Sequence, residues 1–278
     1  LVHPRRMIPW LPLAPGLVAG HHSHAEVHYD LGALARRVKA KFIEEGVIAF
    51  DPVRRTATTA AGQVLEFDLA SIDAEASSVD AGVPGLRQNA LLARPFAVFL
   101  EGWERIVELV KEGRLRTLNL VGGDAWSIEL MLAMHHRLGR ELSADLMRAC
   151  GFAIVTPSAR LLQGWPEAFG ARVEAECLER GISLMRGAAV IEVARDGLRL
   201  ANGARLASDV TVWAQGSHAP RWFDSAGLDR DGMGRLRVDA QAAALVEPGL
   251  VIGAGDVKEV IGGRQGVVRE QQAKRLED

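Results

Sequence analysis

A buried strand that runs into two glycines and then into a helix is the feature that most constrains the fold of this chain. The stretch LNLVGGDAWSIEL covers Leu118–Leu130 and places an apolar run directly before Gly122 and Gly123. The following segment, WSIELMLAMHHRLGREL, carries Ile128, Leu132, His135 and Leu138 along one stripe at helical spacing. Strand, tight turn and helix in this order predict the opening of a βαβ unit.

Short apolar runs alternate with helical patterns through the middle of the chain. RTLNLVGG, FAIVTP and ISLMRG predict strands, and FAVFLEGWERIVELVKEG and FGARVEAECLERG predict helices. This alternation predicts an α/β fold with a mostly parallel sheet and helices on both of its faces. Residues 47–73 and 189–216 predict small antiparallel β-meanders, the second with hairpin turns at Asp196-Gly197 and Asn202-Gly203.

Three further segments complete the expected elements. DLGALARRVKAKFIEEG has apolar residues at Leu31, Leu34, Val38 and Phe42, which predict a helix that ends at Gly46. DAGVPGLRQNALLARP has the glycine and proline density of a linker. PGLVIGAGD predicts one more buried strand.

Composition narrows the classes of function. The chain has 278 residues and a net charge of -2, so it has room for one large or two small domains and lacks the basic surface of a nucleic-acid-binding protein. Cys150 and Cys177, the two cysteines, are too far apart in sequence for a redox-active CxxC pair. No apolar run reaches the ~18 residues of a membrane span, and no secretory signal is visible. We therefore expect a cytoplasmic protein without membrane attachment.

The turn at Gly122 only partly matches the chemistry of a dinucleotide site. A Rossmann turn uses one glycine for its bend, a second for close approach of the pyrophosphate, and a third for packing of strand on helix. Gly122 fills the first position, but Asp124 and Ser127 occupy the second and third. A carboxylate ~4 Å from a phosphate oxygen costs roughly 1 kcal/mol in water and several times more at lower dielectric. Two interpretations remain: a nucleotide site with altered phosphate chemistry, or an ordinary turn with a closed pocket.

Other residues near this turn also depart from the pattern. Trp126 is a further obstruction or a lid over the site. The acidic residue that would bind ribose hydroxyls after the next strand is missing, because Thr156, Pro157 and Ser158 stand there.

A second constellation is GLVIGAGDVKEV, in which a buried strand ends at Gly253 and Gly255 and Asp256 follows. Glycines let a backbone pass close to a ligand, and a carboxylate there can accept hydrogen bonds from a polyol such as a ribityl chain. The alternative is that Asp256 caps the next helix.

Four histidines cluster in AGHHSHAEVH: His21, His22, His24 and His28. Their spacing could host a metal, but the acidic residues nearby are only Glu26 and Asp30. We predict a polar loop before a helix and no metal site. The chain has no G-x-S-x-G motif and no P-loop, so no catalytic residue is assigned.

Taken in order, these segments resemble the pyridine nucleotide–disulfide oxidoreductase superfamily, and within it the FAD-dependent type II NADH dehydrogenase-like proteins. The resemblance is carried by FDLASID, GVPG, LVGGDAWSIELMLAMHHRL, VWAQGSHAP and GLVIGAGDV, and it covers nearly the whole chain. Residues 14–52, from APGLVAGHHSHAEVHYDL to VIAFDP, resemble most closely the branch associated with selenide, water dikinase.

The resemblance implies two Rossmann-like three-layer lobes. An FAD-binding lobe would comprise residues 1–93 and 221–278, and an NAD(P)H-binding lobe would comprise residues 94–220. The N-terminal βα unit of the first lobe is not among these residues, and we expect it to precede Leu1.

The resemblance also implies which residues bind the cofactors: Gly255 and Asp256 at the flavin ribityl chain, Gly216 in the segment matching the family's Ala-Thr-Gly, and Gly122, Gly123 and Glu129 in the nicotinamide-nucleotide fingerprint. The implied reaction is hydride transfer from NAD(P)H to FAD and onward to a quinone or another small acceptor. The resemblance leaves open the acceptor and the choice between NADH and NADPH. It further implies selenide, water dikinase as a possible partner and a homodimer as a possible assembly.

Several positions differ from the family pattern. Gln215 stands where the family has the threonine of Ala-Thr-Gly, and Ala74 and Glu75 stand where it tends to Gly and Ser near the flavin phosphates. The alternative function is therefore a non-catalytic binding or regulatory protein that keeps this fold with impaired nucleotide sites.

Overall fold

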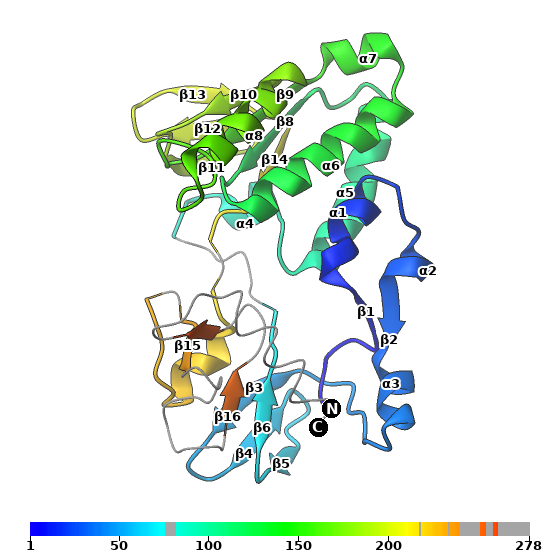
Figure 1. The fold of residues 1–278 in the computed structure, drawn as a ribbon, viewed down its shortest axis with the longest axis vertical. Helices are drawn as coiled ribbons and strands as arrows, with labels where there is room; N and C mark the ends of the chain where they lie inside the picture. The colour runs from blue at the N-terminus through cyan, green and yellow to red at the C-terminus, as the bar shows by residue number, and fades with distance from the viewer. Residues whose placement is uncertain (76–81, 217, 233, 239–250, 254–257, 261–278) are drawn as a thin grey trace. The chain divides into compact units, whose positions relative to one another are not determined.

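The computed structural model describes residues 1–75, 82–216, 218–232, 234–238, 251–253 and 258–260 (Figure 1). The chain forms two compact units. Unit 1 contains Leu1–Ile8, Asp30–Ser77 and Ser217–Asp278, and unit 2 contains Pro9–Tyr29 and Ser78–Gly216. The predicted lobes were defined by the cofactor that each would bind, whereas these two units are defined by contacts within the chain. The division into an FAD-binding and an NAD(P)H-binding lobe stays a prediction.

Unit 2 is built on a parallel sheet of five strands. In spatial order these are β10 (Ile182–Met185), β9 (Gly151–Val155), β8 (Thr117–Val121), β14 (Val210–Trp213) and β7 (Ala90–Leu92). Every neighbouring pair is parallel, as the alternating pattern predicts. The α/β class is therefore confirmed.

The two faces of this sheet are covered by different layers. Leu118, Leu120 and Val212 belong to a core cluster with the helices α5 (Phe96–Lys111), α6 (Ala125–Glu141) and α8 (Glu167–Glu179). Val121 and Trp213, one residue further along β8 and β14, belong to a second cluster with the β-meander. This switch follows from the period of two along a strand, which turns successive side chains to opposite faces.

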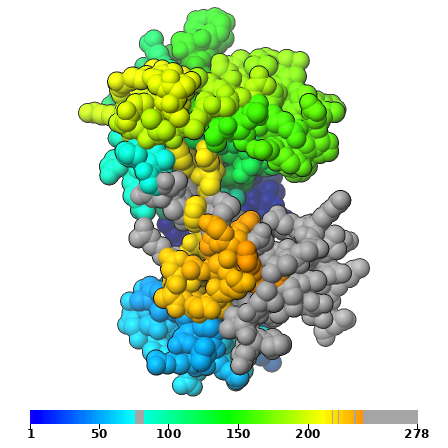
Figure 2. Space-filling view, turned by 90° about the vertical axis from the view of Figure 1, so that its left-hand side faces the viewer, coloured from blue at the N-terminus to red at the C-terminus, as the bar shows by residue number. Residues whose placement is uncertain are grey.

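The prediction of helices on both faces is wrong for unit 2. The connections β7–α5–β8, β8–α6–β9 and β9–α8–β10 all step in the same direction across the sheet. Parallel connections are right-handed, so helices that step in one direction cover one face. The other face is covered by the antiparallel meander of β11 (Val190–Ala194), β12 (Gly197–Leu200) and β13 (Arg205–Ala207). These strands, coloured yellow-green, form part of the outer surface of the unit in Figure 2.

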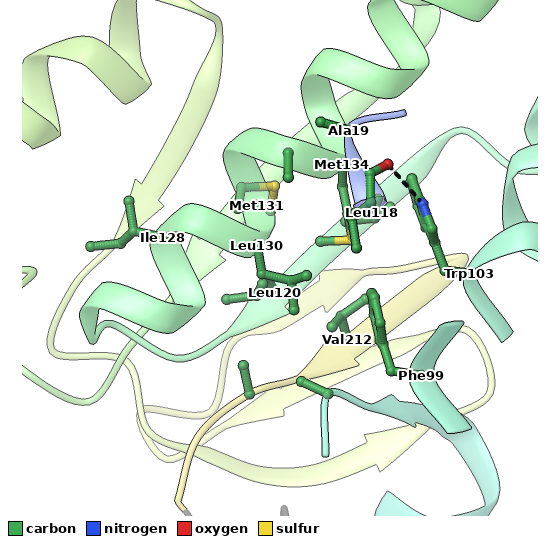
Figure 3. Packing of buried hydrophobic residues seen from close by; sticks show 14 of the residues in the cluster. Ala19, Phe99, Trp103, Leu118, Leu120, Ile128, Leu130, Met131, Met134 and Val212 are labelled. Carbon is green, nitrogen blue, oxygen red and sulfur yellow. Dashed lines mark hydrogen bonds between the residues drawn. The ribbon is translucent and has the colours of Figure 1, made fainter. Parts of the chain in front are cut away.

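The helical layer is held together by long apolar side chains. The buried positions of α5 are Phe96, Phe99, Leu100, Trp103, Ile106, Val107 and Val110. Their spacing makes one continuous apolar stripe. Figure 3 shows Trp103 of α5 beside Met134 of α6, and Phe99 of α5 beside Val212 of β14, all in one cluster of buried residues. The short helix α7 (Ala144–Ala149) follows α6.

Residues Pro9–Tyr29 pack within unit 2. They form the 3-10 turn η1 (Leu11–Leu13) and the short helices α1 (Ala14–Val18) and α2 (His24–Val27). Ala14 and Val18 are fully buried in the same cluster as α5 and α6. In Figure 1 the dark blue α1 lies beside α6, in agreement with these shared contacts.

Unit 1 contains the predicted first meander, which is confirmed. The strands β3 (Val47–Asp51), β4 (Thr56–Thr59) and β5 (Val64–Glu66) are antiparallel neighbours. A separate strand, β6 (Ala70–Ile72), pairs in parallel with β16 (Val251–Gly253), and β15 (Leu236–Val238) pairs in parallel with β17 (Lys258–Val260). The core includes Phe50 and Ile72 together with Phe223 of the 3-10 helix η2 (Arg221–Ser225).

The predicted helix after Asp30 is shorter than expected. Helix α3 covers Leu31–Arg37, and Lys39 then adopts a left-handed φ of 57°. Leu31 is buried, but Leu34 and Val38 are exposed, so only part of the predicted apolar stripe is buried. The short strands β1 (Met7–Pro9) and β2 (His28–Asp30) pair just before this helix.

The predicted linker contains an element of the sheet. Residues in DAGVPGLRQNALLARP form α4 (Leu86–Asn89) and the edge strand β7. Gly85, before α4, has φ 76°, and a Cβ there would lie 2.0 Å from the carbonyl oxygen of Val193. The glycine signal therefore marked a close backbone approach, which sequence alone does not distinguish from a flexible segment.

Candidate functional site

The glycine turn between β8 and α6 lies at the carboxyl edge of the parallel sheet. The amide of Gly122 donates to the carbonyl oxygen of Val155 at 2.9 Å, and the amide of Ala214 donates to that of Val121 at 2.9 Å. The ends of β8, β9 and β14 thus meet here. In open α/β sheets the crevice beyond the carboxyl ends of the strands is where ligands bind.

Both glycines of the turn are required by the packing of the chain on itself. A Cβ on Gly122 would lie 2.3 Å from the Oγ of Ser127, and a Cβ on Gly123 would lie 2.7 Å from the Oγ1 of Thr156. These distances are far below van der Waals contact. The glycines therefore let α6 and the end of β9 approach the turn, whether or not a ligand is bound.

Asp124 is the N-cap of α6. Its Oδ1 accepts a hydrogen bond from the backbone amide of Ser127 at 2.8 Å and another from the Ser127 hydroxyl. Asp124 itself is exposed, whereas Ser127 is fully buried. The amides of Ala125 and Trp126, in the first turn, have no acceptor inside the helix. These two amides fit an anion such as a diphosphate, and the Asp124 carboxylate beside them opposes one.

Glu129 lies in α6 next to this N-cap. Desolvation by the surrounding protein and the negative charge of Asp124 raise the pKa of the Glu129 carboxyl. The start of α6 thus carries two neighbouring acids that repel each other. Gly122, Gly123 and Glu129, which were predicted to form the nicotinamide-nucleotide fingerprint, all lie at this turn.

Trp126 is held by an arginine and a phenylalanine. The guanidinium carbon of Arg94 lies 5.0 Å from the centre of the Trp126 ring, and the Phe96 ring meets that ring edge-on at 5.7 Å. The Trp126 Nε1 is buried and has no hydrogen-bond partner among the described residues. A cation over an indole face is an attractive contact, so Arg94 brings a positive charge beside the N-terminus of α6.

The loop after β9 folds against the glycine turn. The amide of Leu162 donates to the carbonyl oxygen of Gly123 at 2.8 Å, and the amide of Leu161 donates to Glu174 at 2.9 Å. Glu174 in turn pairs with Arg186 at 2.7 Å. No sequence motif marks Glu174, because its role depends on a loop and a helix that meet only in the fold.

The remaining predicted cofactor-binding residues are only partly described. Gly216 has φ 72°, and a Cβ there would meet nothing within 4 Å, so its glycine is favoured by backbone conformation. Gly255 and Asp256 lie outside the described residues. Their proposed contact with a ribityl chain stays a prediction.

The histidine cluster is divided between several contacts. The Nε2 atoms of His21 and His136 lie 2.9 Å apart, and the rings of His24 and His28 stack with centres 5.4 Å apart. Within the part of the chain that the structure describes, no three metal-ligating side chains come together. His136 lies on α6, far from His21 in sequence, so this pair could not be found from local spacing.

In the described part of the chain, none of the helices combines the length and the apolar character that crossing a bilayer requires.

A parallel sheet with a glycine turn at its carboxyl edge, leading into a long helix, defines a Rossmann-like nucleotide-binding class of protein. A family model described as pyridine nucleotide-disulphide oxidoreductase matches residues 32–273. The chain belongs to this family, as the sequence resemblance predicted.

Curated relatives include two NADH dehydrogenase-like proteins of Mycobacterium tuberculosis, Rv1812c from strain H37Rv and MT1860 from strain CDC 1551. Each is 27% identical over 228 residues, which cover 76% of this chain and 53% of the relative. The chain thus spans about half the length of the curated relatives it matches. They support the NADH dehydrogenase-like resemblance but not the narrower selenide, water dikinase branch.

Solved structures with a similar fold include NDH2 of Plasmodium falciparum in complex with NADH. It has a TM-score of 0.80 at 14% identity and covers 94% of this chain and 59% of its own. The sulfide:quinone oxidoreductase of Aquifex aeolicus has a TM-score of 0.79 at 19% identity and covers 100% of this chain and 71% of its own. At these identities the likeness concerns the fold.

Proposed function

We propose that this chain is part of an FAD-dependent NAD(P)H oxidoreductase that passes a hydride from a nicotinamide nucleotide to the flavin and its electrons on to a quinone or another small acceptor. The observation that carries this proposal is the glycine turn at the carboxyl edge of the sheet in a chain of this family. The similar proteins add support, since they include NADH dehydrogenase-like proteins and a sulfide:quinone oxidoreductase.

The residues of unit 2 have distinct parts in the proposed nucleotide site. The amides of Ala125 and Trp126 would donate to the diphosphate, and Gly122 and Gly123 keep the turn tight enough to present them. Arg94 adds a positive charge beside Trp126. Glu129 is the acid that follows the fingerprint and would lie next to the bound nucleotide.

The flavin would be held by Gly255 and Asp256, in an FAD-binding lobe of residues 1–93 and 221–278. Residues 94–220 would form the NAD(P)H-binding lobe, which includes Gly216 of the segment that matches the family's Ala-Thr-Gly. When bound, FAD supplies the hydride-accepting chemistry, and the protein orients the two nucleotides and tunes their surroundings. No side chain is assigned a proton-transfer role.

The partners and location are further parts of the proposal. The resemblance of residues 14–52 to the selenide, water dikinase-associated branch is the reason to propose that enzyme as a partner. A homodimer is proposed as the assembly. A cytoplasmic location is proposed because two cysteines without a disulfide framework fit a reducing compartment.

An absorbance spectrum of the full-length natural protein tests the proposal. We expect the visible bands of a bound flavin, and we expect them to bleach anaerobically on addition of NADH or NADPH. Flavin bands that neither nucleotide bleaches would leave a flavoprotein without this activity. A protein that takes up no flavin even after incubation with FAD would exclude the proposed function.

The second candidate function is a non-catalytic binding or regulatory protein on the same fold. Asp124 favours it, because a carboxylate already satisfies the Ser127 amide where the family pattern has a glycine and an open approach. The spectrum separates the two candidates, since only the oxidoreductase is reduced by a nicotinamide nucleotide.

A further inference from the structure

We propose that the Asp124 carboxylate is a built-in competitor for the diphosphate of the dinucleotide, and that it lowers the affinity of this site by holding the N-terminus of α6 for itself. The inference rests on the proposed function, and it assigns to Asp124 a role that sets affinity rather than a catalytic one. Asp124 is the N-cap of the helix whose first turn would receive the nucleotide.

Asp124 already acts as the anion at the N-terminus of this helix. Its Oδ1 accepts from the Ser127 amide at 2.8 Å and from the Ser127 hydroxyl. A diphosphate at a Rossmann turn uses the same helix N-terminus and the same positive end of the helix dipole. Two anions at the N-terminus of one helix repel each other. When the nucleotide binds, the carboxylate must therefore move away, or the repulsion weakens binding.

Asp124 and Ser127 depend on each other for their hydrogen bonds. Ser127 is fully buried, and its hydroxyl has the Asp124 carboxylate as its acceptor. The same hydroxyl occupies the space beside Gly122, where a Cβ would come within 2.3 Å of the Ser127 Oγ. If Asp124 moves away, a buried amide and a buried hydroxyl lose their acceptor, which is costly unless another acceptor replaces it.

The charges around the turn have both signs. Glu129 is a second acid, whose pKa is raised by the nearby charge of Asp124, and Arg94 places a cation over the Trp126 ring. Because an acid beside the diphosphate repels it, salt should screen the repulsion and favour binding. At a site whose charges attract phosphate, added salt weakens nucleotide binding instead.

The test is the dissociation constant of NAD⁺ and of ADP-ribose for the full-length flavin-loaded protein, measured by calorimetry. Oxidised NAD⁺ is used because it binds without reducing the flavin. Asp124→Asn keeps a cap acceptor for the Ser127 amide but removes the charge. We expect it to lower the dissociation constant about tenfold, which corresponds to about 1.4 kcal/mol. We also expect added salt to tighten binding in the parent protein and not in this variant.

Asp209→Asn is the matched control. Asp209 also accepts from two backbone amides, those of Arg116 and Thr117 at 2.8 and 2.9 Å, but these lie at the amino end of β8. The substitution removes the same charge at the opposite edge of the sheet, so we expect no change in nucleotide affinity.

Thermal stability provides a second readout. Asp124→Gly removes both charge and cap, so we expect a lower melting temperature together with tighter nucleotide binding. A merely structural cap would lower stability without any gain in affinity.

Three outcomes decide the inference. Unchanged affinity in Asp124→Asn, or an equal gain in the Asp209 control, overturns it, and the proposed function still stands if NADH bleaches the flavin of the parent protein. Tighter binding in Asp124→Asn alone supports it, even if the parent protein is not reduced by NADH. Absence of binding in the parent and in both Asp124 variants overturns the inference and the proposed function together.

Discussion

The indole Nε1 of Trp103, in the middle of α5, donates a hydrogen bond to the carbonyl oxygen of Val18 at 3.3 Å (Figure 3). Trp103 and Val18 are both fully buried. Val18 ends the short helix α1, whose last carbonyls have no partner within the helix. The contact therefore attaches the N-terminal segment Pro9–Tyr29 to the helical layer of unit 2.

We expect Trp103→Phe to lower the free energy of unfolding by roughly 2 kcal/mol, because it leaves the Val18 carbonyl without a donor and opens a small cavity. Chemical denaturation measures this change. Trp10→Phe is the control, since Trp10 is 53% exposed, and its effect should be within about 0.5 kcal/mol. Equal effects at the two positions would contradict the attachment.

Gly85 should not tolerate any side chain. Its φ of 76° is left-handed, and a Cβ would lie 2.0 Å from the Val193 carbonyl oxygen. We expect Gly85→Ala to cost roughly 3 kcal/mol, as strain adds to a backbone clash. Gly203→Ala isolates the strain, because Gly203 has φ 85° with no atom within 4 Å of a Cβ, and should cost only about 1 kcal/mol. Denaturation of the two variants gives the difference.

The contact between His21 and His136 should weaken in mild acid. Desolvation, the charge of His21 and then that of Arg140 lower the pKa of His136 below its usual value of 6.5. The folded state therefore binds fewer protons than the unfolded state, so its stability is full above pH 6.5 and falls as the pH drops through the window below it. His135, whose pKa burial also lowers, acts with the same sign.

His136→Gln separates the two histidines. We expect the variant to lose part of the pH dependence of thermal stability below pH 6.5 while keeping the part due to His135. The measurement is the melting temperature at a series of pH values. An unchanged slope in the variant would show that the His21–His136 pair does not contribute.

The ion pair of Asp30 and Arg6 should make the stability of unit 1 depend on pH in a second, more acidic range. The Arg6 guanidinium bonds both carboxylate oxygens at 2.9 Å, and with the Ala33 amide it lowers the pKa of Asp30 from 3.8 to about 2. The stabilising effect is present above pH 3.8 and is lost as the pH falls from there to about 2. NMR titration of the Asp30 carboxyl should show its pKa return toward 3.8 in Arg6→Met. A titration unchanged by that substitution would contradict the pairing.

Much of the fold could be predicted because the information is local in the chain. The period of two along β8 and the stripe of α5 follow from side-chain geometry, and Asn202-Gly203 selects its hairpin turn. Two elements, and the placement of the helices on the sheet, could not be predicted this way. Strand β7 has only three residues and depends on pairing with β14, and α3 stops early at Arg37. The helices share one face because of the order of strands in the sheet.

The candidate site divides in the same manner. The residue order alone indicates that Gly122 and Gly123 join a buried strand to a long helix, and that Asp124 and Ser127 replace two glycines of the dinucleotide pattern. The cap that Asp124 forms on α6 through Ser127 is local in the chain, but the contact of Arg94 with the Trp126 ring arises only in the folded protein. Residue type and order fix local conformation, whereas the partner of an indole depends on which distant segments pack beside it.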